Sequence, residues 1–201
     1  MLDCVGPHIA YNTVGVIACI HALNLNVEEA AISLKSIQLP RGRGGQVEIP
    51  LKSGASLTLI DESYNASPIA MQAALAVLGS KVPKYGGRRV AILGDMLELG
   101  LDGPALHANL LDHLLAAKPD LVITIGGLMR ELHDKIPSTI SCLHADRSVD
   151  VSQKVSDQLR AGDLILIKGS LGTNMAPIVS AIENMKSNSR SPCQSLEVGG
   201  S

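Results

Sequence analysis

The sequence has very few aromatic residues and no long hydrophobic run. Its 201 residues include three tyrosines, no phenylalanine and no tryptophan. Proteins that bind single-stranded nucleic acid stack the bases on aromatic side chains, so this composition argues against that function. A formal net charge of -2 also argues against binding by phosphate neutralisation, and we predict no nucleic-acid partner. No stretch of about 18 apolar residues occurs, so we predict no membrane partner.

The cysteines form no recognisable pattern. There is no Cys-x-x-Cys pair and no histidine at zinc spacing, which predicts no metal site built from protein ligands. The start of the chain lacks the basic and then apolar regions of a signal peptide. We therefore predict a cytoplasmic protein with reduced thiols. The four cysteines are Cys4, Cys19, Cys142 and Cys193.

Three common motifs of nucleotide-binding and catalytic sites are also absent. The sequence has no Gly-x-x-x-x-Gly-Lys-Ser/Thr phosphate loop, no Gly-x-Gly-x-x-Gly after a strand and no Gly-x-Ser-x-Gly. The glycine-rich run at residues 41–45 follows a predicted helix and lacks the Lys-Ser/Thr ending, so it matches a phosphate loop weakly. A nicotinamide-dependent oxidoreductase is disfavoured for the same reason. The chain thus contains at most half of a catalytic site.

Apolar residues follow helix and strand periods in alternation, which predicts an α/β fold. A helical pair is predicted at residues 8–25 and 27–37, followed by a break at residues 40–45. Strands are predicted at residues 47–49, 57–60, 88–93, 121–125, 139–143 and 164–167. Helices are predicted at residues 69–78, 106–117, 128–135, 149–159 and 175–185. This order indicates a mostly parallel sheet in a Rossmann-like three-layer αβα domain, with a disordered tail at residues 187–201.

Polar side chains follow three of the predicted strands. Asp61 and Glu62 end one strand, Asp95 ends another, and Lys168 and Ser170 end a third. Because the carboxyl ends of parallel strands share one edge of a sheet, we expect these groups to lie together. A cation and carboxylates at such an edge suit a phosphorylated or carboxylated ligand. The alternative is that the aspartates cap helices and that Lys168 is a solvated charge.

Three motifs, in order along the chain, resemble the signature sequences of the Mur ligases. They are residues 61–68 (DESYNASP), residues 89–100 (RVAILGDMLELG) with His107, and residues 166–170 (LIKGS) with Met175. Upstream, Gly6-Pro7-His8 with Asn12, and Gly42-Arg43-Gly44, are similar to segments of the ATPase domain and its hinge. The resemblance covers about residues 5–185. Within the family it points to the members that join D-alanyl-D-alanine to a UDP-N-acetylmuramoyl-tripeptide.

The resemblance implies a domain organisation and a reaction. Mur ligases have a domain for the UDP-sugar, a central ATPase domain with the phosphate loop, and a Rossmann-like C-terminal domain for the incoming amino acid or dipeptide. Residues 1–45 would be the end of the central domain, with a helical pair and hinge. Residues 46–186 would be the C-terminal domain. The family uses ATP and Mg²⁺ to activate a peptide carboxylate as an acyl phosphate, which the acceptor amine attacks.

By this resemblance the chain lacks the UDP-sugar domain and the phosphate loop. We therefore expect a fragment that is inactive alone and whose partners include the missing N-terminal and central domains. Its substrates would be a UDP-N-acetylmuramoyl-tripeptide and D-alanyl-D-alanine, for peptidoglycan synthesis. The alternative is a non-catalytic Rossmann-like module that binds a nucleotide or a peptide.

The resemblance also carries site residues onto this sequence. Asn12 would lie beside the adenine, His8 near the nucleotide, and Arg43 at the phosphates or ribose. Glu62 would hold the ribose hydroxyls, and Tyr64 and Asn65 would line the cleft. The structural alternatives are a helix cap and its neighbour for Asn12 and His8, and a solvated linker charge for Arg43. The groups expected to face the dipeptide are Asp95, Lys168 and Ser170.

Two positions depart from the family pattern. Ser67 stands where the family usually has asparagine, and it retains the capacity for a local hydrogen bond. Leu171 stands where many members have arginine, and it cannot act as a cation.

Overall fold

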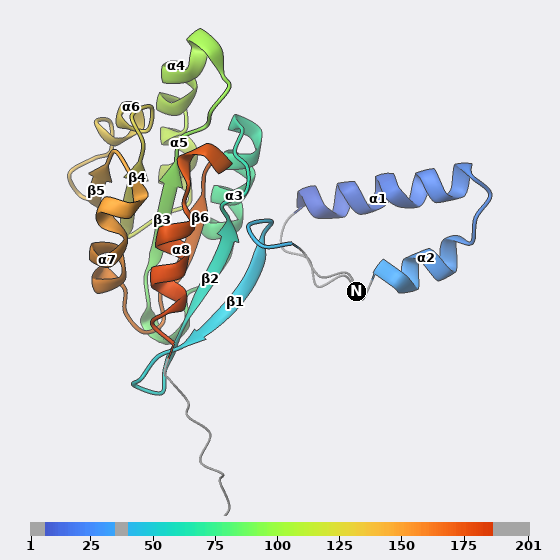
Figure 1. Cartoon of the computed structure of the whole chain (residues 1–201), viewed down its shortest axis with the longest axis horizontal. Coiled ribbons are helices and arrows are strands. Elements are labelled where there is room, and N and C mark those ends of the chain that lie inside the picture. The colour runs from blue at the N-terminus through green and yellow to red at the C-terminus, as the bar shows by residue number, and fades with distance from the viewer. Residues whose placement is uncertain (1–6, 35–39, 187–201) are drawn as a thin grey trace, which may run out of the picture.

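The computed structural model describes residues 7–34 and 40–186, and its centre is a six-stranded sheet (Figure 1). The strands are β1 (Gly45–Pro50), β2 (Ser56–Glu62), β3 (Arg89–Gly94), β4 (Leu121–Ile125), β5 (Ser141–Ala145) and β6 (Leu164–Lys168). Their spatial order is β1-β2-β6-β3-β4-β5. β1 pairs antiparallel with β2 as a hairpin, and every other pair is parallel. The predicted α/β class and mostly parallel sheet are confirmed.

Helices cover both faces of the sheet, because its central strands are apolar on both sides. In β6, Leu164 and Leu166 pack in one hydrophobic cluster and Ile165 and Ile167 in the other. The first cluster is covered by α3 (Pro68–Ser80), α4 (Gly103–Ala108), α5 (Leu111–Ala116) and α6 (Arg130–His133). The second is covered by α7 (Ser148–Gln158) and α8 (Ala176–Glu183). Short 3₁₀ turns lie at Lys84–Gly86, Gly100–Asp102 and Leu171–Thr173.

The connections change face between two neighbouring strands. The chain leaves β3 towards the helices of the first face, whereas it leaves β6 towards α8 on the second face. β3 and β6 are adjacent and parallel, so the connections that leave their carboxyl ends go to opposite faces of the sheet. In open α/β sheets such a switch point is the usual place of a ligand crevice. A ligand crevice is therefore expected between the loops that follow β3 and β6.

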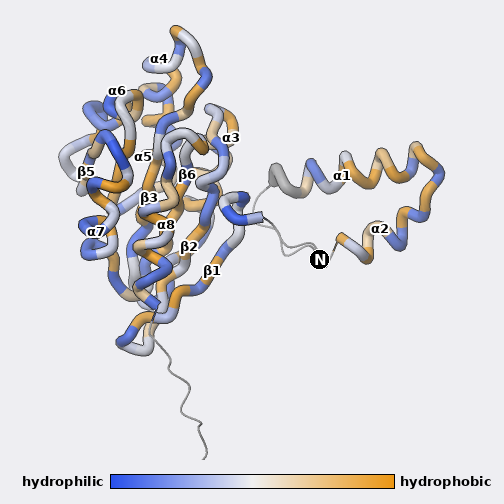
Figure 2. Tube along the Cα trace, viewed as in Figure 1, coloured by the Kyte–Doolittle hydropathy of each residue, from blue (hydrophilic) through white to orange (hydrophobic). Residues whose placement is uncertain are grey.

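Two helices precede the sheet, α1 (Pro7–Ala22) and α2 (Val27–Ser33), and they pack on each other. Asn26 caps α2, since its side chain accepts a hydrogen bond from the Glu29 backbone N–H (3.0 Å). Figure 2 shows apolar positions along both helices, and several large apolar side chains are exposed. These are Tyr11, Val14, Val16, Leu23, Leu25 and Ile32. The second predicted helix extended to residue 37, and residues 35–39 lie outside the described part.

Several predicted elements differ from the structure in their bounds, and two of these differences come from turns. The helix predicted at residues 106–117 is divided into α4 and α5, because the Leu110 N–H donates to the His107 carbonyl (3.1 Å) in a tight turn. The strand predicted at residues 139–143 begins two residues later, at Ser141. Its first predicted residues belong to a turn in which the Ile140 N–H donates to the Pro137 carbonyl (3.0 Å). Both errors come from turns that apolar periodicity does not reveal.

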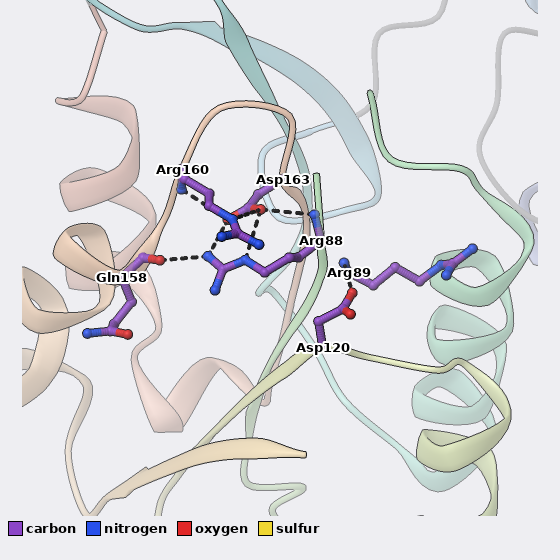
Figure 3. Close-up of polar contacts among 6 residues, drawn as sticks. All are labelled: Arg88, Arg89, Asp120, Gln158, Arg160 and Asp163. Carbon is purple, nitrogen blue, oxygen red and sulfur yellow. Dashed lines mark hydrogen bonds and ion pairs between the residues drawn. The ribbon is translucent and has the colours of Figure 1, made fainter. Parts of the chain in front are cut away.

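A cluster of charges holds the amino ends of β3 and β6 (Figure 3). The fully buried Asp163 carboxylate accepts hydrogen bonds from the backbone N–H and the guanidinium of Arg88, the latter at 2.8 Å from Nη2. It also accepts from the Arg160 N–H (3.0 Å), while the Asp120 carboxylate accepts from the Arg89 N–H (2.8 Å). Asp163 is thus paired with the Arg88 guanidinium, whereas the Arg89 guanidinium donates to the Lys81 carbonyl (2.9 Å). The opposite, carboxyl edge carries the polar groups of the candidate site.

Candidate functional site

The polar groups predicted at three strand ends lie at one edge of the sheet. Glu62 and Lys168 are register partners at the ends of β2 and β6, and Lys168 is also the register partner of Leu93 in β3. Asp95 follows β3, and its carbonyl accepts a hydrogen bond from the Ser170 N–H (2.9 Å). Residues up to 106 positions apart in the chain therefore meet at the carboxyl edge.

Lys168 and Glu62 form a buried ion pair. Lys168 Nζ lies 2.8 Å from Glu62 Oε2, and the two side chains are only 5% and 7% exposed. Lys168 also donates to the Asn65 carbonyl (3.0 Å), which ties the loop after β2 to the end of β6. Glu62 Oε1 is buried and has no hydrogen-bond partner among the described residues. Lys168 is therefore not a solvated charge, and in this conformation each group binds the other.

The Asp95 carboxylate binds the chain that follows β4. It accepts from the Met129 N–H (2.7 Å) and more weakly from the Leu128 N–H (3.3 Å). Gly126 permits this contact, because its φ is +107° and an added Cβ would overlap the Asp95 carboxylate. Asp95 therefore caps the turn before α6. A helix cap is the alternative predicted for this aspartate, but the capped turn follows β4 and not β3.

The loop after β3 is held by two further side chains. Ser170 Oγ accepts from the Leu97 N–H (2.9 Å), which links the loops after β3 and β6. The fully buried His107 accepts from the Met96 N–H at Nε2 (2.8 Å), and its Nδ1 lies 2.6 Å from the Gly103 carbonyl. A carbonyl only accepts, so this network assigns His107 as a neutral imidazole with its proton on Nδ1. The sequence motif included His107 but gave it no role.

Arg43 and Tyr64 come together beside the end of β2. The Arg43 guanidinium lies 4.1 Å from the centre of the Tyr64 ring, a cation–π contact. The Tyr64 N–H donates to the Gly42 carbonyl (3.1 Å), and Asp61 accepts from the Gly42 N–H with its carboxylate (3.2 Å) and from the Gly44 N–H with its carbonyl (2.7 Å). Asp61 therefore positions Arg43. The sequence predicts Asp61 at this edge of the sheet, but Asp61 is not among the predicted ligand-binding residues.

Two cavities open at this edge and share Asn174. The first, about 210 Å³, lies between the end of β2 and α8, and its lining includes Gly42, Asp61, Tyr64 and Glu183. The second, about 310 Å³, lies over the switch point. Its lining includes Asp95, Gly126, Gly127, Asp146, Arg147, Ser148, Thr173 and Asn174. We call this second cavity the switch-point cavity.

The switch-point cavity has charges of both signs at its rim. The side chains of Asp146 and Arg147 are 78% and 73% exposed. The N-terminus of α7 begins beside them at Ser148, whose hydroxyl donates to the Asn174 carbonyl (2.6 Å). Sequence reasoning missed Asp146, Arg147 and Asn174. They follow β5 and β6, but no motif marked the two charged residues.

The remaining predicted site residues lie elsewhere or are described only in part. Tyr64 and Asn65 are exposed at the carboxyl edge. Asn12 is exposed on α1, and His8 belongs to the same helix although its side chain lies outside the described part. Over residues 7–34 and 40–186, no group of three or more His, Cys, Asp or Glu side chains could hold a metal ion. Over the same residues, no helix is long and apolar enough to cross a membrane.

Comparison with known proteins relates the chain to an enzyme family. Residues 49–171 match the model of the Mur ligase, glutamate ligase domain. The chain is 34% identical over 172 residues to the UDP-N-acetylmuramoyl-tripeptide–D-alanyl-D-alanine ligase of Rickettsia prowazekii. It is 31% identical over 177 residues to the ligase of the same name from Bacillus subtilis. These alignments cover 86% and 87% of this chain but only 36% and 37% of the relatives, so the chain spans little more than a third of their length.

Solved structures show the same fold. MurF from Acinetobacter baumannii superposes with a TM-score of 0.72 at 22% identity, covering 91% of this chain and 39% of that protein. MurF ligase from Thermotoga maritima, in complex with ADP, superposes with a TM-score of 0.66 at 22% identity, covering 84% of this chain and 36% of that protein. The match to the family model extends over more than half of the chain. This chain belongs to the Mur ligase family and carries its glutamate ligase domain, the C-terminal domain of MurF-like proteins.

Proposed function

We propose that this chain is the acceptor-binding part of an ATP-dependent ligase that adds D-alanyl-D-alanine to a UDP-N-acetylmuramoyl-tripeptide in the cytoplasm. The observation that carries the proposal is the pair of cavities that meet at Asn174. One cavity adjoins the segment that presents Arg43, and the other has charges of both signs. A ligase must bring an activated carboxylate and an amine into line, which accounts for much of its rate. Adjoining cavities suit that task.

The switch-point cavity suits a dipeptide with free termini. D-Alanyl-D-alanine carries one carboxylate and one ammonium group. Arg147 and the N-terminus of α7 would attract the carboxylate, since a guanidinium donates two hydrogen bonds and a helix start favours an anion. Asp146 would attract the ammonium group. Direct dipeptide contacts by Asp95, Lys168 and Ser170 stay predictions, because their side-chain oxygens and nitrogen already bind protein groups.

The Arg43 side of the edge would face the nucleotide. Arg43 is exposed and stacks on Tyr64, so its guanidinium could donate to a phosphate or ribose outside the domain. We further propose that residues 1–45 complete a central ATPase domain, in which His8 and Asn12 would lie near the nucleotide. Glu62 would reach the ribose only if its pair with Lys168 opened.

ATP and Mg²⁺ would be held mainly by groups outside this sequence. No phosphate loop occurs in the 201 residues, and the described residues offer no metal cluster. Catalysis of acyl-phosphate formation depends on groups that position the phosphates and the metal. We therefore expect the chain alone to bind the dipeptide but not to turn over ATP.

Calorimetry of the chain with D-alanyl-D-alanine and with ATP, run separately, tests the proposal. We expect saturable binding of the dipeptide, weakened at least about tenfold by Arg147→Gln, since a charge-assisted hydrogen bond contributes about 1.5–3 kcal/mol. The matched control is Arg160→Gln, which removes an exposed arginine at the amino edge and should leave binding unchanged. Equal binding by both variants would contradict the assignment of the cavity.

A chimaera tests the reaction itself. This chain would replace the matching third of the Rickettsia prowazekii ligase, to which it is 34% identical. ATP-dependent ligation of D-alanyl-D-alanine by the chimaera would support the enzyme. A folded chimaera that binds the dipeptide without joining it would favour the non-catalytic binding module.

A further inference from the structure

Two histidines and a threonine form a partly buried cluster behind the rim of the switch-point cavity. Thr124 Oγ1, in β4, lies 2.9 Å from His144 Nδ1 and 3.2 Å from His133 Nδ1. The two imidazole rings, from β5 and α6, are 5.2 Å apart at their centres. On its other side, His144 Nε2 lies 3.5 Å from an Asp146 carboxylate oxygen. The cluster thus connects the sheet to a charged residue of the rim.

The contacts of Thr124, together with the unpartnered Nε2 of His144, indicate which nitrogen of each ring carries a proton. The Thr124 hydroxyl donates its single proton to the Leu143 carbonyl (3.3 Å). We assign both imidazole Nδ1 atoms as donors to the two lone pairs of Thr124 Oγ1, because in this conformation a proton on His144 Nε2 would be buried without a hydrogen-bond partner. A neutral His144 then has a bare lone pair on Nε2. This atom is buried and has no hydrogen-bond partner among the described residues.

The neutral ring therefore has no proton to offer the Asp146 carboxylate, although the two atoms are close. Protonation would place a hydrogen on Nε2 and satisfy both groups at once. We propose that His144 is a positioning residue whose protonation state sets the place of Asp146 at the rim of the switch-point cavity. In the neutral form Asp146 is held only by its exposed pair with Arg130 (3.8 Å), so it can turn into the cavity. In the protonated form Asp146 is bonded to His144 and the rim is more positive by one charge.

The groups around His144 come from three elements. Arg130 and His133 face it from α6, Asp146 faces it from the turn after β5, and the uncharged Thr124 faces it from β4. Burial lowers the pKa of His144 below 6.5, and Arg130 and His133 lower it further, whereas Asp146 acts in the opposite direction. The ring is therefore neutral at pH 7 and charges on acidification.

Nuclear magnetic resonance on the full 201-residue chain tests this inference without any ligand. The His144 ring and the Asp146 and Arg147 amides would be followed from pH 8 to pH 5. We expect the amides to shift with the midpoint of the His144 ring, below pH 6.5. Amides that follow another midpoint, or that do not shift, would overturn the inference. The result is independent of whether the cavity binds the dipeptide.

Replacing Asp146, the exposed partner of His144, separates a positioning role of His144 from a purely structural one. Asp146→Asn removes the charge that favours the imidazolium and should lower the His144 midpoint by roughly 0.2–0.7 pH unit. Asp157→Asn, an exposed carboxylate near the end of α7, is the matched control and should leave the midpoint unchanged. An unchanged midpoint in Asp146→Asn would show that the two groups do not interact.

Discussion

At the scale of single residues, the ion pair of Lys168 and Glu62 determines how the loop after β2 is held. Replacing Lys168 by methionine would leave the Glu62 carboxylate buried without its partner. We expect Lys168→Met to lower the free energy of unfolding by about 3–5 kcal/mol, measured by urea denaturation. Adding Glu62→Leu should recover most of that loss, because the double variant leaves no buried charge.

Lys84→Met is the matched control for this prediction. Lys84 pairs with Glu48 at 3.1 Å, but their side chains are 51% and 41% exposed. Surface pairs contribute about 0–1 kcal/mol, so this variant should remain within about 1 kcal/mol of the parent. Equal losses in Lys168→Met and Lys84→Met would contradict the description of the buried pair.

Gly126 offers a second test at a single position. Gly126→Ala would place a Cβ on the Asp95 carboxylate in a backbone conformation that favours glycine. We expect a loss of roughly 1–3 kcal/mol in thermal or urea unfolding, since both strain and the cap of the next turn are affected. The neighbouring Gly127 has open space around its Cα, so Gly127→Ala serves as the control. Similar losses in both variants would argue against a specific contact with Asp95.

The positions of the site residues could be predicted from the sequence, but their partners could not. Strand endings followed by polar residues placed Glu62, Asp95 and Lys168 at one edge. The carboxylate of Asp95 binds amides 33 and 34 residues further on, and Lys168 binds a group 106 residues away. Such contacts depend on how loops pack in space, and no local pattern encodes them.

At the scale of elements, α3 begins where the sequence predicts a helix start. Ser67 is the N-cap, with its hydroxyl accepting from the Ala70 N–H (3.3 Å), and Pro68 occupies the first turn. Ser67→Ala should cost about 1 kcal/mol in urea unfolding, whereas Ser67→Asn should be nearly neutral because asparagine caps equally well. Ser53→Ala, in the exposed turn between β1 and β2, is the control. A large loss in Ser67→Asn would contradict a capping role.

The β1–β2 hairpin should respond to pH through Glu48. Burial alone would raise the pKa of Glu48, but hydrogen bonds from Thr58, Lys84 and Ser56 together lower it below 4.5. The folded state then binds fewer protons than the unfolded state between that lowered pKa and 4.5. The stabilisation is present above pH 4.5 and is lost as the pH falls through the folded pKa.

Urea denaturation as a function of pH checks this contribution. Glu48→Gln should reduce the loss of stability on acidification through this range while changing little above it. An identical dependence in the parent and the variant would show that Glu48 does not contribute. Apolar runs at residues 47–49 and 57–60 predict the two strands of this hairpin, whereas no local signal marks the turn that divides α4 from α5.

At the scale of the whole molecule, the carboxyl edge of the sheet would be one half of a ligase site. The ion pair of the buried Asp163 with Arg88 holds the opposite edge, and the switch of helices between β3 and β6 opens a cavity at this one. The sequence could predict the mostly parallel sheet and its polar edge, because alternating strands and helices require parallel crossovers, but not the strand order or the switch point. It could not predict the two cavities, since their shape depends on turns such as the left-handed one at Asn174.

Mapping the dipeptide onto the chain tests the central claim most directly. Amide spectra of the full chain would be recorded during titration with millimolar D-alanyl-D-alanine. The account predicts shifts confined to the lining of the switch-point cavity, at Gly126, Gly127, Arg147, Ser148 and Asn174. Shifts around Asp163 at the amino edge, or no shifts at all, would contradict it.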